Sequence, residues 1–293
     1  MKHILQINNL CKNYNNIKAI NNISLTVKKN EVYGLLGPNG SGKTTTLGVI
    51  LDVLKANGGN YKWFDNNKSS RHKIGSLLET PNFYPYLTLY ENLKIVATIK
   101  NAPEKDIIYS LGVTNLLTRK HSKFSNLSLG MKQRLALAST LIGNPEVLVL
   151  DEPTNGLDPE GITDVRNIIK AEAAKGKTII LASHILDEVE KVCSHVGILK
   201  SGKLIANGKV KELLNSNDLL YLNSENNETL LKLIKKSDMV SNIVETKPEI
   251  IITLNNNYKA SDFNEYAFNN GVILNTILTK QVSLEKQFLE LVK

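Results

Sequence analysis

A glycine-rich stretch at residues 37–44 is the feature that most constrains how this chain folds. It reads Gly-Pro-Asn-Gly-Ser-Gly-Lys-Thr and matches the pattern Gly-x-x-x-x-Gly-Lys-Ser/Thr of a phosphate-binding loop. An apolar run at residues 32–36 precedes it and predicts a buried strand, while residues 43–54 follow with a helical pattern. Strand, loop and helix in this order predict an α/β fold in which the loop binds a phosphate group.

The residue types of the loop indicate how it holds phosphate. Glycines let the backbone adopt positive φ and turn its N–H groups toward an anion, and the helix start beyond adds the positive end of its dipole. Lys43 supplies a mobile charge for the β- and γ-phosphates, and Thr44 supplies a hydroxyl for Mg²⁺. The residues expected to contact the nucleotide here are Gly37, Pro38, Asn39, Gly40, Ser41, Gly42, Lys43, Thr44 and Thr45.

Two acidic residues, Asp151 and Glu152, end a second apolar run at residues 147–150. Such a run is typical of a central parallel strand, and ligands bind at the carboxyl ends of such strands. We expect Asp151 to hold Mg²⁺ and Glu152 to polarise an attacking water; a helix-capping acid pair is the alternative. His184 ends another apolar run, at residues 178–182, and either faces the same site or has a structural role.

A second helix start with anion-binding character lies further along the chain. Residues 88–142 are expected to be mostly helical, and Thr88 with Glu91 forms a capping-box pattern. Within this region Ser128 is the expected N-cap of a helix over residues 131–142, and Gly130 allows a ligand to approach closely.

The residues before the loop predict a small, mostly antiparallel sheet. Residues 3–9 and 23–27 alternate between apolar and polar types, as half-buried strands do. Residues 10–16 are expected to form a polar turn region that contains Tyr14. This aromatic side chain either stacks on an adenine ring or is an ordinary loop residue.

Composition limits the class of protein. The formal net charge is +8, but no run of five basic residues occurs, so we expect a solvated basic surface and no nucleic-acid partner. Cys11 and Cys193 lack metal-ligand neighbours and are interpreted as reduced structural thiols. The sequence has neither an apolar run long enough to span a bilayer nor an apolar leader, which predicts a cytoplasmic protein or one peripheral to the membrane.

Taken in order, these motifs resemble those of the ATP-binding cassette (ABC) ATPases over about residues 1–215. The matching positions are residues 37–44 for the Walker A loop, 127–131 for the family signature, 147–152 for Walker B with its catalytic glutamate, 156–158 for the D-loop with Asp158, His184 for the switch histidine and Tyr14 for the adenine-stacking aromatic. The resemblance implies a P-loop NTPase core with an antiparallel β subdomain and a helical subdomain. It also implies ATP and Mg²⁺ as ligands and an ATP-dependent, head-to-tail dimer.

In such a dimer the signature of one subunit faces the ATP held by the other. By resemblance the residues acting in this way are Ser128, Leu129, Gly130 and Met131. Leu129 and Met131 depart from the usual Leu-Ser-Gly-Gly-Gln. At the switch position, where glutamine is usual, the chain has Glu79, which is similar to the ATPase subunits of bacitracin-resistance and lantibiotic-immunity exporters. Glu79 is expected to coordinate Mg²⁺ through an oxygen and to link the site to the membrane partner, or else to be a tolerated substitute for glutamine.

Residues 216–293 contain no phosphate motif and are expected to form a small accessory domain. Its expected order is strand, helix, strand, strand, helix, strand and a final helix over residues 283–292, which suggests a ferredoxin-like α+β unit. Residues 215–217 are the expected linker, and an irregular extension is the alternative.

The resemblance implies an ATPase subunit that powers export of an antimicrobial peptide, antibiotic or related amphiphile through a separate transmembrane permease. We expect it at the inner face of the plasma membrane. The rival class is a non-transport ABC ATPase that acts on DNA or on the ribosome. DNA-organising relatives carry a long coiled coil before the signature, and ribosome-acting relatives carry two cassettes, whereas this chain has no sustained heptads between Gly37 and Ser128 and has a single phosphate loop.

Overall fold

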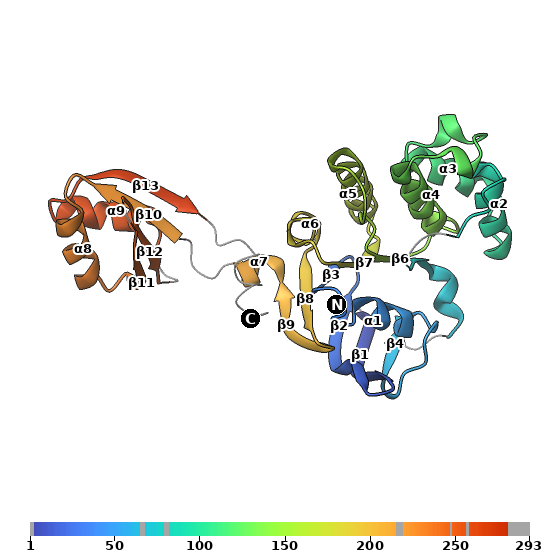
Figure 1. The fold of residues 1–293 in the computed structure, drawn as a ribbon, viewed down its shortest axis with the longest axis horizontal. Helices are drawn as coiled ribbons and strands as arrows, with labels where there is room; N and C mark the ends of the chain where they lie inside the picture. Colours follow the sequence, from blue (N-terminus) through green and yellow to red (C-terminus); the bar gives the residue numbers. More distant parts are fainter. Residues whose placement is uncertain are drawn as a thin grey trace. The chain divides into compact units, whose positions relative to one another are not determined.

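The computed structural model describes residues 3–64, 68–78, 82–214, 219–246, 248–255 and 258–280. The chain divides into two compact units, Met1–Val210 and Lys211–Lys293 (Figure 1). The first unit contains the phosphate loop and every motif discussed above. Each unit is described by itself below.

An antiparallel sheet of three strands opens the first unit. Its strands are β1 (His3–Tyr14), β2 (Ile17–Lys28) and β4 (Gly58–Trp63), in the order β2-β1-β4. Apolar side chains from β1 and β2, such as Leu5 and Val27, pack with Leu47 of the helix α1 (Lys43–Ile50) in one core. This agrees with the small antiparallel sheet predicted from the alternating residues.

The expectation that residues 10–16 form a turn region is wrong for the part up to Tyr14. Strand β1 continues through Tyr14, which pairs with Ile17 across a tight connection. The register between β1 and β2 shifts between Ile7 and Leu10, and Asn9 has φ 49°. Such a bulge breaks the alternation of apolar and polar residues that marks a strand in a sequence.

A six-stranded sheet forms the centre of the unit, in the order β5-β6-β7-β3-β8-β9. All neighbouring strands are parallel except β8 and β9, which are antiparallel. The strands are β3 (Val32–Leu36), β5 (Ile74–Leu77), β6 (Val147–Asp151), β7 (Thr178–Ser183), β8 (His195–Lys200) and β9 (Lys203–Lys209). The residues of β3, β6 and β7 are buried throughout, which explains their continuous apolar runs.

Helices cover both faces of this sheet. Helix α1 and the antiparallel sheet lie on one face, and α5 (Pro159–Ala174) with α6 (Leu186–Val192) lies on the other (Figure 1). A separate helical region comprises α2 (Leu89–Ile99), α3 (Glu104–Val113) and α4 (Leu129–Leu141), with 3₁₀ turns at Leu117–Arg119 and Phe124–Asn126 between α3 and α4. Another 3₁₀ turn, Lys68–Lys73, precedes β5. The region has its own apolar core, and the capping box of Thr88 and Glu91 is present at the start of α2.

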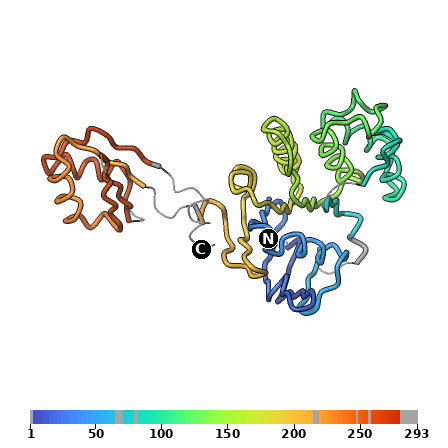
Figure 2. The backbone as a smooth tube through the Cα atoms, in the orientation of Figure 1, coloured from blue at the N-terminus to red at the C-terminus, as the bar shows by residue number. Residues whose placement is uncertain are grey.

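The second unit contains a four-stranded antiparallel sheet, drawn in orange and red in Figure 2. Its strand order is β11-β12-β10-β13. After the short helix α7 (Val210–Leu214), the elements follow as β10 (Leu219–Ser224), α8 (Asn227–Lys236), β11 (Val240–Glu245), β12 (Ile250–Leu254), α9 (Ala260–Asn269) and β13 (Leu274–Lys280). This is the predicted order; the predicted linker at residues 215–217 and the predicted final helix at residues 283–292 lie outside the described residues.

Within the described part of the chain, no helix is both long enough and apolar enough to cross a bilayer.

Candidate functional site

The glycine-rich loop connects β3 to α1 and passes very close to neighbouring backbone. Gly42, the N-cap of α1, has φ 101°, and a Cβ atom built there would lie 2.3 Å from the carbonyl oxygen of Ala19. A Cβ on Gly37 would lie 2.4 Å from the carbonyl oxygen of Leu199. Both positions therefore exclude any side chain, so that the loop curls tightly around the start of the helix.

Lys43 points its ammonium group back into this loop. Its Nζ donates to the carbonyl oxygens of Gly37, at 2.8 Å, and Pro38, at 3.3 Å. The side chain is only 6% exposed, and Nζ lies 3.2 Å from Oε1 of Glu152. The positive charge expected at the phosphates is thus held at the centre of the loop by two carbonyls and a carboxylate.

Other polar groups of the loop fit a bound phosphate. Ser41 is 2% exposed, and its Oγ is a buried oxygen without a hydrogen-bond partner among the described residues. A buried hydroxyl in this state is stabilised when a ligand oxygen supplies the missing bond. Thr44 is exposed and Thr45 half-buried in the first helical turn, where Thr46 Oγ1 donates to the carbonyl of Gly42.

The acidic pair lies at the carboxyl end of β6. Asp151 is 3% exposed and is the last residue of the strand. Glu152 follows with φ 44°, a backbone conformation uncommon for a residue with a side chain, and its N–H donates to the carbonyl of Ala182 on β7 at 3.0 Å. The oxygen atoms of Asp151 and the Thr44 hydroxyl are donors of the kind that Mg²⁺ prefers, so this end of the sheet fits the ion.

His184 is brought to the same place by β7. Its Nδ1 lies 2.8 Å from Oε2 of Glu152, whose other oxygen contacts Lys43. Because β3, β6 and β7 are neighbouring parallel strands, Lys43, Glu152 and His184 meet where these strands end. The structure thus brings Lys43 together with two residues that lie more than a hundred positions later in the sequence.

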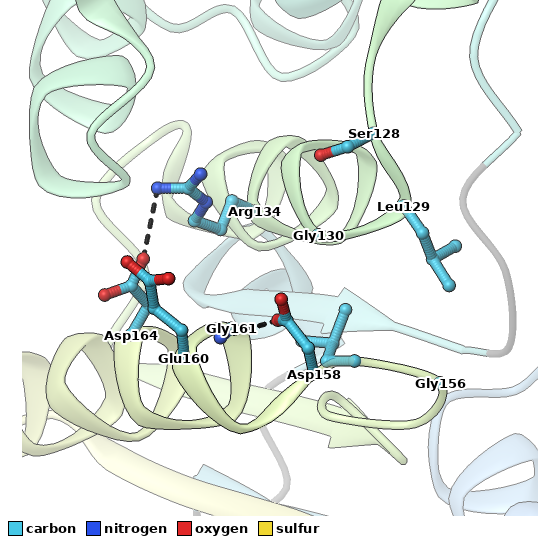
Figure 3. A pocket seen from close by; sticks show the side chains of 10 residues that line it. Ser128, Leu129, Gly130, Arg134, Gly156, Asp158, Glu160, Gly161 and Asp164 are labelled. Carbon is cyan, nitrogen blue, oxygen red and sulfur yellow. Dashed lines mark hydrogen bonds and ion pairs between the residues drawn. The ribbon is translucent and has the colours of Figure 1, made fainter.

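The signature residues lie at the start of α4 and face the start of α5 (Figure 3). Ser128 caps α4, its Oγ accepting from Met131 N at 3.3 Å, and Leu129 is 57% exposed. Asp158 caps α5, accepting from Gly161 N at 3.0 Å. Between the two helix starts is a cavity of about 410 Å³, lined by Ser128, Leu129, Gly130, Arg134, Gly156, Leu157, Asp158, Glu160, Gly161 and Asp164.

Sequence reasoning did not single out several residues that shape this region. Arg134 pairs with Asp164 at 3.2 Å, which joins α4 to α5 beside the cavity (Figure 3). Gln133 donates to the carbonyl of Pro153 at 2.9 Å and so links α4 to the segment after Glu152. Helical spacing puts Arg134 four residues after Gly130 on one side of α4, and that spacing was the available signal.

The remaining two predicted residues are Tyr14 and Glu79. Tyr14 is 44% exposed at the end of β1, and the Nζ of Lys12 lies 5.1 Å from its ring centre. Glu79 follows β5 but lies outside the described residues.

Comparison with known proteins gives consistent results. A family profile described as "ABC transporter" matches residues 20–155. The chain is 34% identical over 300 residues to the bacitracin transport ATP-binding protein BcrA of Enterococcus faecalis, covering 100% of this chain and 97% of that protein. It is 40% identical over 205 residues to the lantibiotic transport ATP-binding protein SrtF of Streptococcus pyogenes, covering 69% of this chain and 89% of that protein.

A solved structure extends the likeness to three dimensions. It is described as a dimeric, post-hydrolysis state of the ATP-binding cassette MJ0796 bound to ADP and phosphate. The TM-score is 0.63 at 25% identity, covering 71% of this chain and 99% of that one.

Proposed function

This chain belongs to the family of ABC transporter ATP-binding proteins, and from that premise we propose how it binds and hydrolyses ATP and what that hydrolysis drives. The observation that carries the proposal is the contact of Glu152 with both Lys43 and His184 at the carboxyl ends of β3, β6 and β7. The Lys43 ammonium group, the Glu152 carboxylate and the His184 ring therefore lie together at this end of the sheet.

The phosphate loop and Lys43 bind the triphosphate. The backbone of residues 37–42 and the start of α1 provide N–H donors. When ATP binds, the Lys43 ammonium group leaves the loop carbonyl oxygens and the Glu152 carboxylate and contacts the β- and γ-phosphates. The Ser41 hydroxyl donates a hydrogen bond to a phosphate oxygen. Thr45, in the first turn of α1, lies beside that phosphate. Tyr14, exposed at the end of β1, stacks on the adenine ring.

Glu152 is the general base of the reaction. Once Lys43 has moved to phosphate, the Glu152 carboxylate accepts a hydrogen bond from the attacking water and makes its oxygen more nucleophilic. His184 holds the other oxygen of that carboxylate, and we expect this contact to bring its ring beside the γ-phosphate of bound ATP. The two side chains thus orient the water for attack in line with the leaving group.

Thr44, Asp151 and Glu79 are the residues that would hold Mg²⁺. The ion would neutralise charge on the β- and γ-phosphates, which is the chemistry it supplies to phosphoryl transfer. Thr44 contributes a hydroxyl at the loop, and Asp151 contributes a carboxylate fixed at the end of a buried strand. Glu79, two residues after β5 in the sequence, is the third proposed oxygen donor.

Two copies of the chain form a head-to-tail dimer around two ATP molecules. The cavity between α4 and α5 presents Ser128, Leu129 and Gly130, and it is large enough to receive the phosphates held by a second copy. Met131, the last of the four signature residues, follows in the first turn of α4. Asp158 shapes the edge of this cavity by fixing the start of α5. The similar cassette solved as a dimer with ADP and phosphate supports this arrangement.

Closure of the dimer drives export of a bacitracin-like or lantibiotic-like peptide through a separate transmembrane permease. The names of the similar bacitracin and lantibiotic transport proteins support this substrate class. The chain works at the inner face of the plasma membrane, where ATP is available.

The nucleotide-binding domain comprises residues 1–215, and residues 216–293 form an accessory α+β domain of the ferredoxin-like type. The division of the chain after Val210 and the strand order β11-β12-β10-β13 in an antiparallel sheet support this assignment.

The test is to express the chain with its membrane subunit in a sensitive bacterium and to measure growth inhibition by bacitracin and by a lantibiotic. Wild type is expected to raise the inhibitory concentration of at least one peptide, and Lys43→Ala is expected to abolish that protection. Equal protection by both forms would refute export driven by this site. Copurification of a ribosome or of DNA in place of the membrane subunit would support the rival, non-transport class.

A further inference from the structure

A buried carboxylate lies beneath the catalytic cluster and belongs to none of the motifs described so far. Glu188 is on α6 and is 7% exposed. Its Oε2 accepts hydrogen bonds from two hydroxyls, Thr154 Oγ1 and Ser183 Oγ, the second at 3.4 Å. Thr154 follows Glu152 by two residues, and Ser183 directly precedes His184. One oxygen atom therefore connects the segments that carry both catalytic side chains.

The Ser183 side of this connection fixes the backbone on both sides of His184. Ser183 Oγ donates to Glu188 and accepts from the N–H of Ile185 at 3.0 Å. The hydroxyl thus spans the peptide units that flank the histidine, so that the direction of the His184 side chain depends on where Ser183 is held.

The Thr154 side fixes the turn that contains Glu152. Asn155 N–H donates to the carbonyl of Glu152 at 3.1 Å, and Leu157 N–H donates to the carbonyl of Thr154 at 3.2 Å. Glu152 itself has φ 44°. Residues in such conformations persist when the surrounding structure over-determines them, and the bond from Thr154 to Glu188 is one of the contacts that does so.

We propose that Glu188 is a positioning residue for ATP hydrolysis. It holds the segment after Glu152 and the segment before His184 in a fixed relative position. This arrangement makes the 2.8 Å contact between the two catalytic side chains possible. The role rests on the function proposed above, in which Glu152 is the base and His184 its partner.

The setting of Glu188 is costly for a carboxyl group, which argues against a purely stabilising role. Burial raises the pKa of Glu188, and the bond from Thr154 and the charge of Arg166 act in the opposite direction. An apolar side chain of similar volume commonly stabilises such a position as well or better. An apolar residue, however, would not accept the hydrogen bonds from Thr154 and Ser183.

The second oxygen of Glu188 is buried beside α5. Glu188 Oε1 and Arg166 Nε are buried polar atoms without a hydrogen-bond partner among the described residues. The positive charge of Arg166, on α5, favours the ionised form of the Glu188 carboxylate. Glu188 Oε2 meanwhile accepts from the two hydroxyls of the catalytic segments.

The test compares variants of the full-length chain in Mg·ATP turnover, nucleotide binding and thermal unfolding. Glu188→Ala is expected to lower kcat by about 10- to 100-fold, because misplaced catalytic groups lose rate steeply, while the Kd for ATP changes by less than about threefold. Glu188→Gln is expected to keep kcat within about threefold of wild type, because the amide oxygen still accepts from both hydroxyls.

A matched control is Glu172→Ala. Glu172 is a fully buried carboxylate on α5 that contacts Tyr109, at 3.2 Å, and Lys175, at 2.6 Å, outside the catalytic segments. Its loss is expected to lower the melting temperature without changing kcat. Should Glu188→Ala fail to fold, Thr154→Val and Ser183→Ala remove the two donors singly. Each is then expected to lower kcat, and the double variant to lose less than the product of the two losses because both act through one carboxylate.

Three results would overturn the role: a wild-type kcat in folded Glu188→Ala, an equal loss of kcat in Glu172→Ala, or a Gln variant as slow as the Ala variant. For the replacement pair, wild-type kcat in both Thr154→Val and Ser183→Ala would overturn it. These outcomes leave the proposed function intact, because wild type still hydrolyses ATP. Absence of turnover in wild type would instead refute the proposed function, and the positioning role with it.

Discussion

Glu152→Gln is expected to bind ATP at least as tightly as wild type while hydrolysing it about 100- to 10,000-fold more slowly, the range that a general base contributes. An amide preserves the shape of the side chain but is a far weaker base. The same change removes the negative charge that faces Lys43, so binding and turnover are expected to move in opposite directions.

The effect on binding follows from the contact between Lys43 and Glu152. Two unit charges 3.2 Å apart attract by about 5 kcal/mol at an effective dielectric constant of about 20. Glu152 is 20% exposed, and a net value of about 2 kcal/mol is typical of a charged hydrogen bond in such a setting. Lys43 must give up this contact to reach phosphate, so its removal favours binding by up to about 30-fold.

Turnover by phosphate release and affinity by calorimetry measure the two effects separately. Gel filtration with Mg·ATP is expected to show the variant as a stable dimer, because bound ATP is no longer consumed. Glu190→Gln is the control, since Glu190 is an exposed carboxylate on α6, and it is expected to match wild type in every assay. A Glu152→Gln protein with wild-type turnover, or with ATP affinity more than about tenfold weaker, would refute the reasoning.

The remaining predictions concern the loop, the switch position and the second unit. Lys43→Ala is expected to abolish measurable ATPase activity, and an unchanged rate would contradict its assignment to the phosphates. Gly42→Ala is expected to lower the melting temperature and abolish ATP binding, because the new Cβ would lie 2.3 Å from the carbonyl oxygen of Ala19; wild-type binding in calorimetry would show that the loop relaxes. Deletion of residues 216–293 is expected to leave a folded, ATP-binding protein, and insolubility or loss of binding would show that the first unit depends on the second. Glu79→Ala is expected to keep ATP affinity within about tenfold while protection of cells falls much further, and full protection by Glu79→Gln would show that the charge has no special role.

The sequence predicted most of the elements that carry the site because their local chemistry is explicit. Helix α5 begins at Pro159 because Asp158 caps it and proline suits the first helical position. The buried strand β6 was predicted by its continuous apolar run and its acidic end. In these cases a few adjacent residues determine the local structure.

Features that depend on contacts across the fold were not predictable in the same way. Strand β1 was predicted to end before Tyr14, because a bulge near Asn9 disrupts the alternation. The role of Glu188 as an acceptor for Thr154 and Ser183 depends on how α6 packs against two strand ends. No spacing within α6 indicates that arrangement, because the partners come from other segments.

The pairing of Lys43 with Glu152 also has a consequence for selectivity. The carboxylate is an internal competitor, tethered to the site at a high effective concentration, and every incoming anion must displace it. A single phosphate or sulfate offers one charged group in place of this carboxylate, so we expect it to bind weakly. A nucleotide triphosphate adds several linked phosphates and a base, so the same internal carboxylate is expected to disfavour simple anions more than ATP.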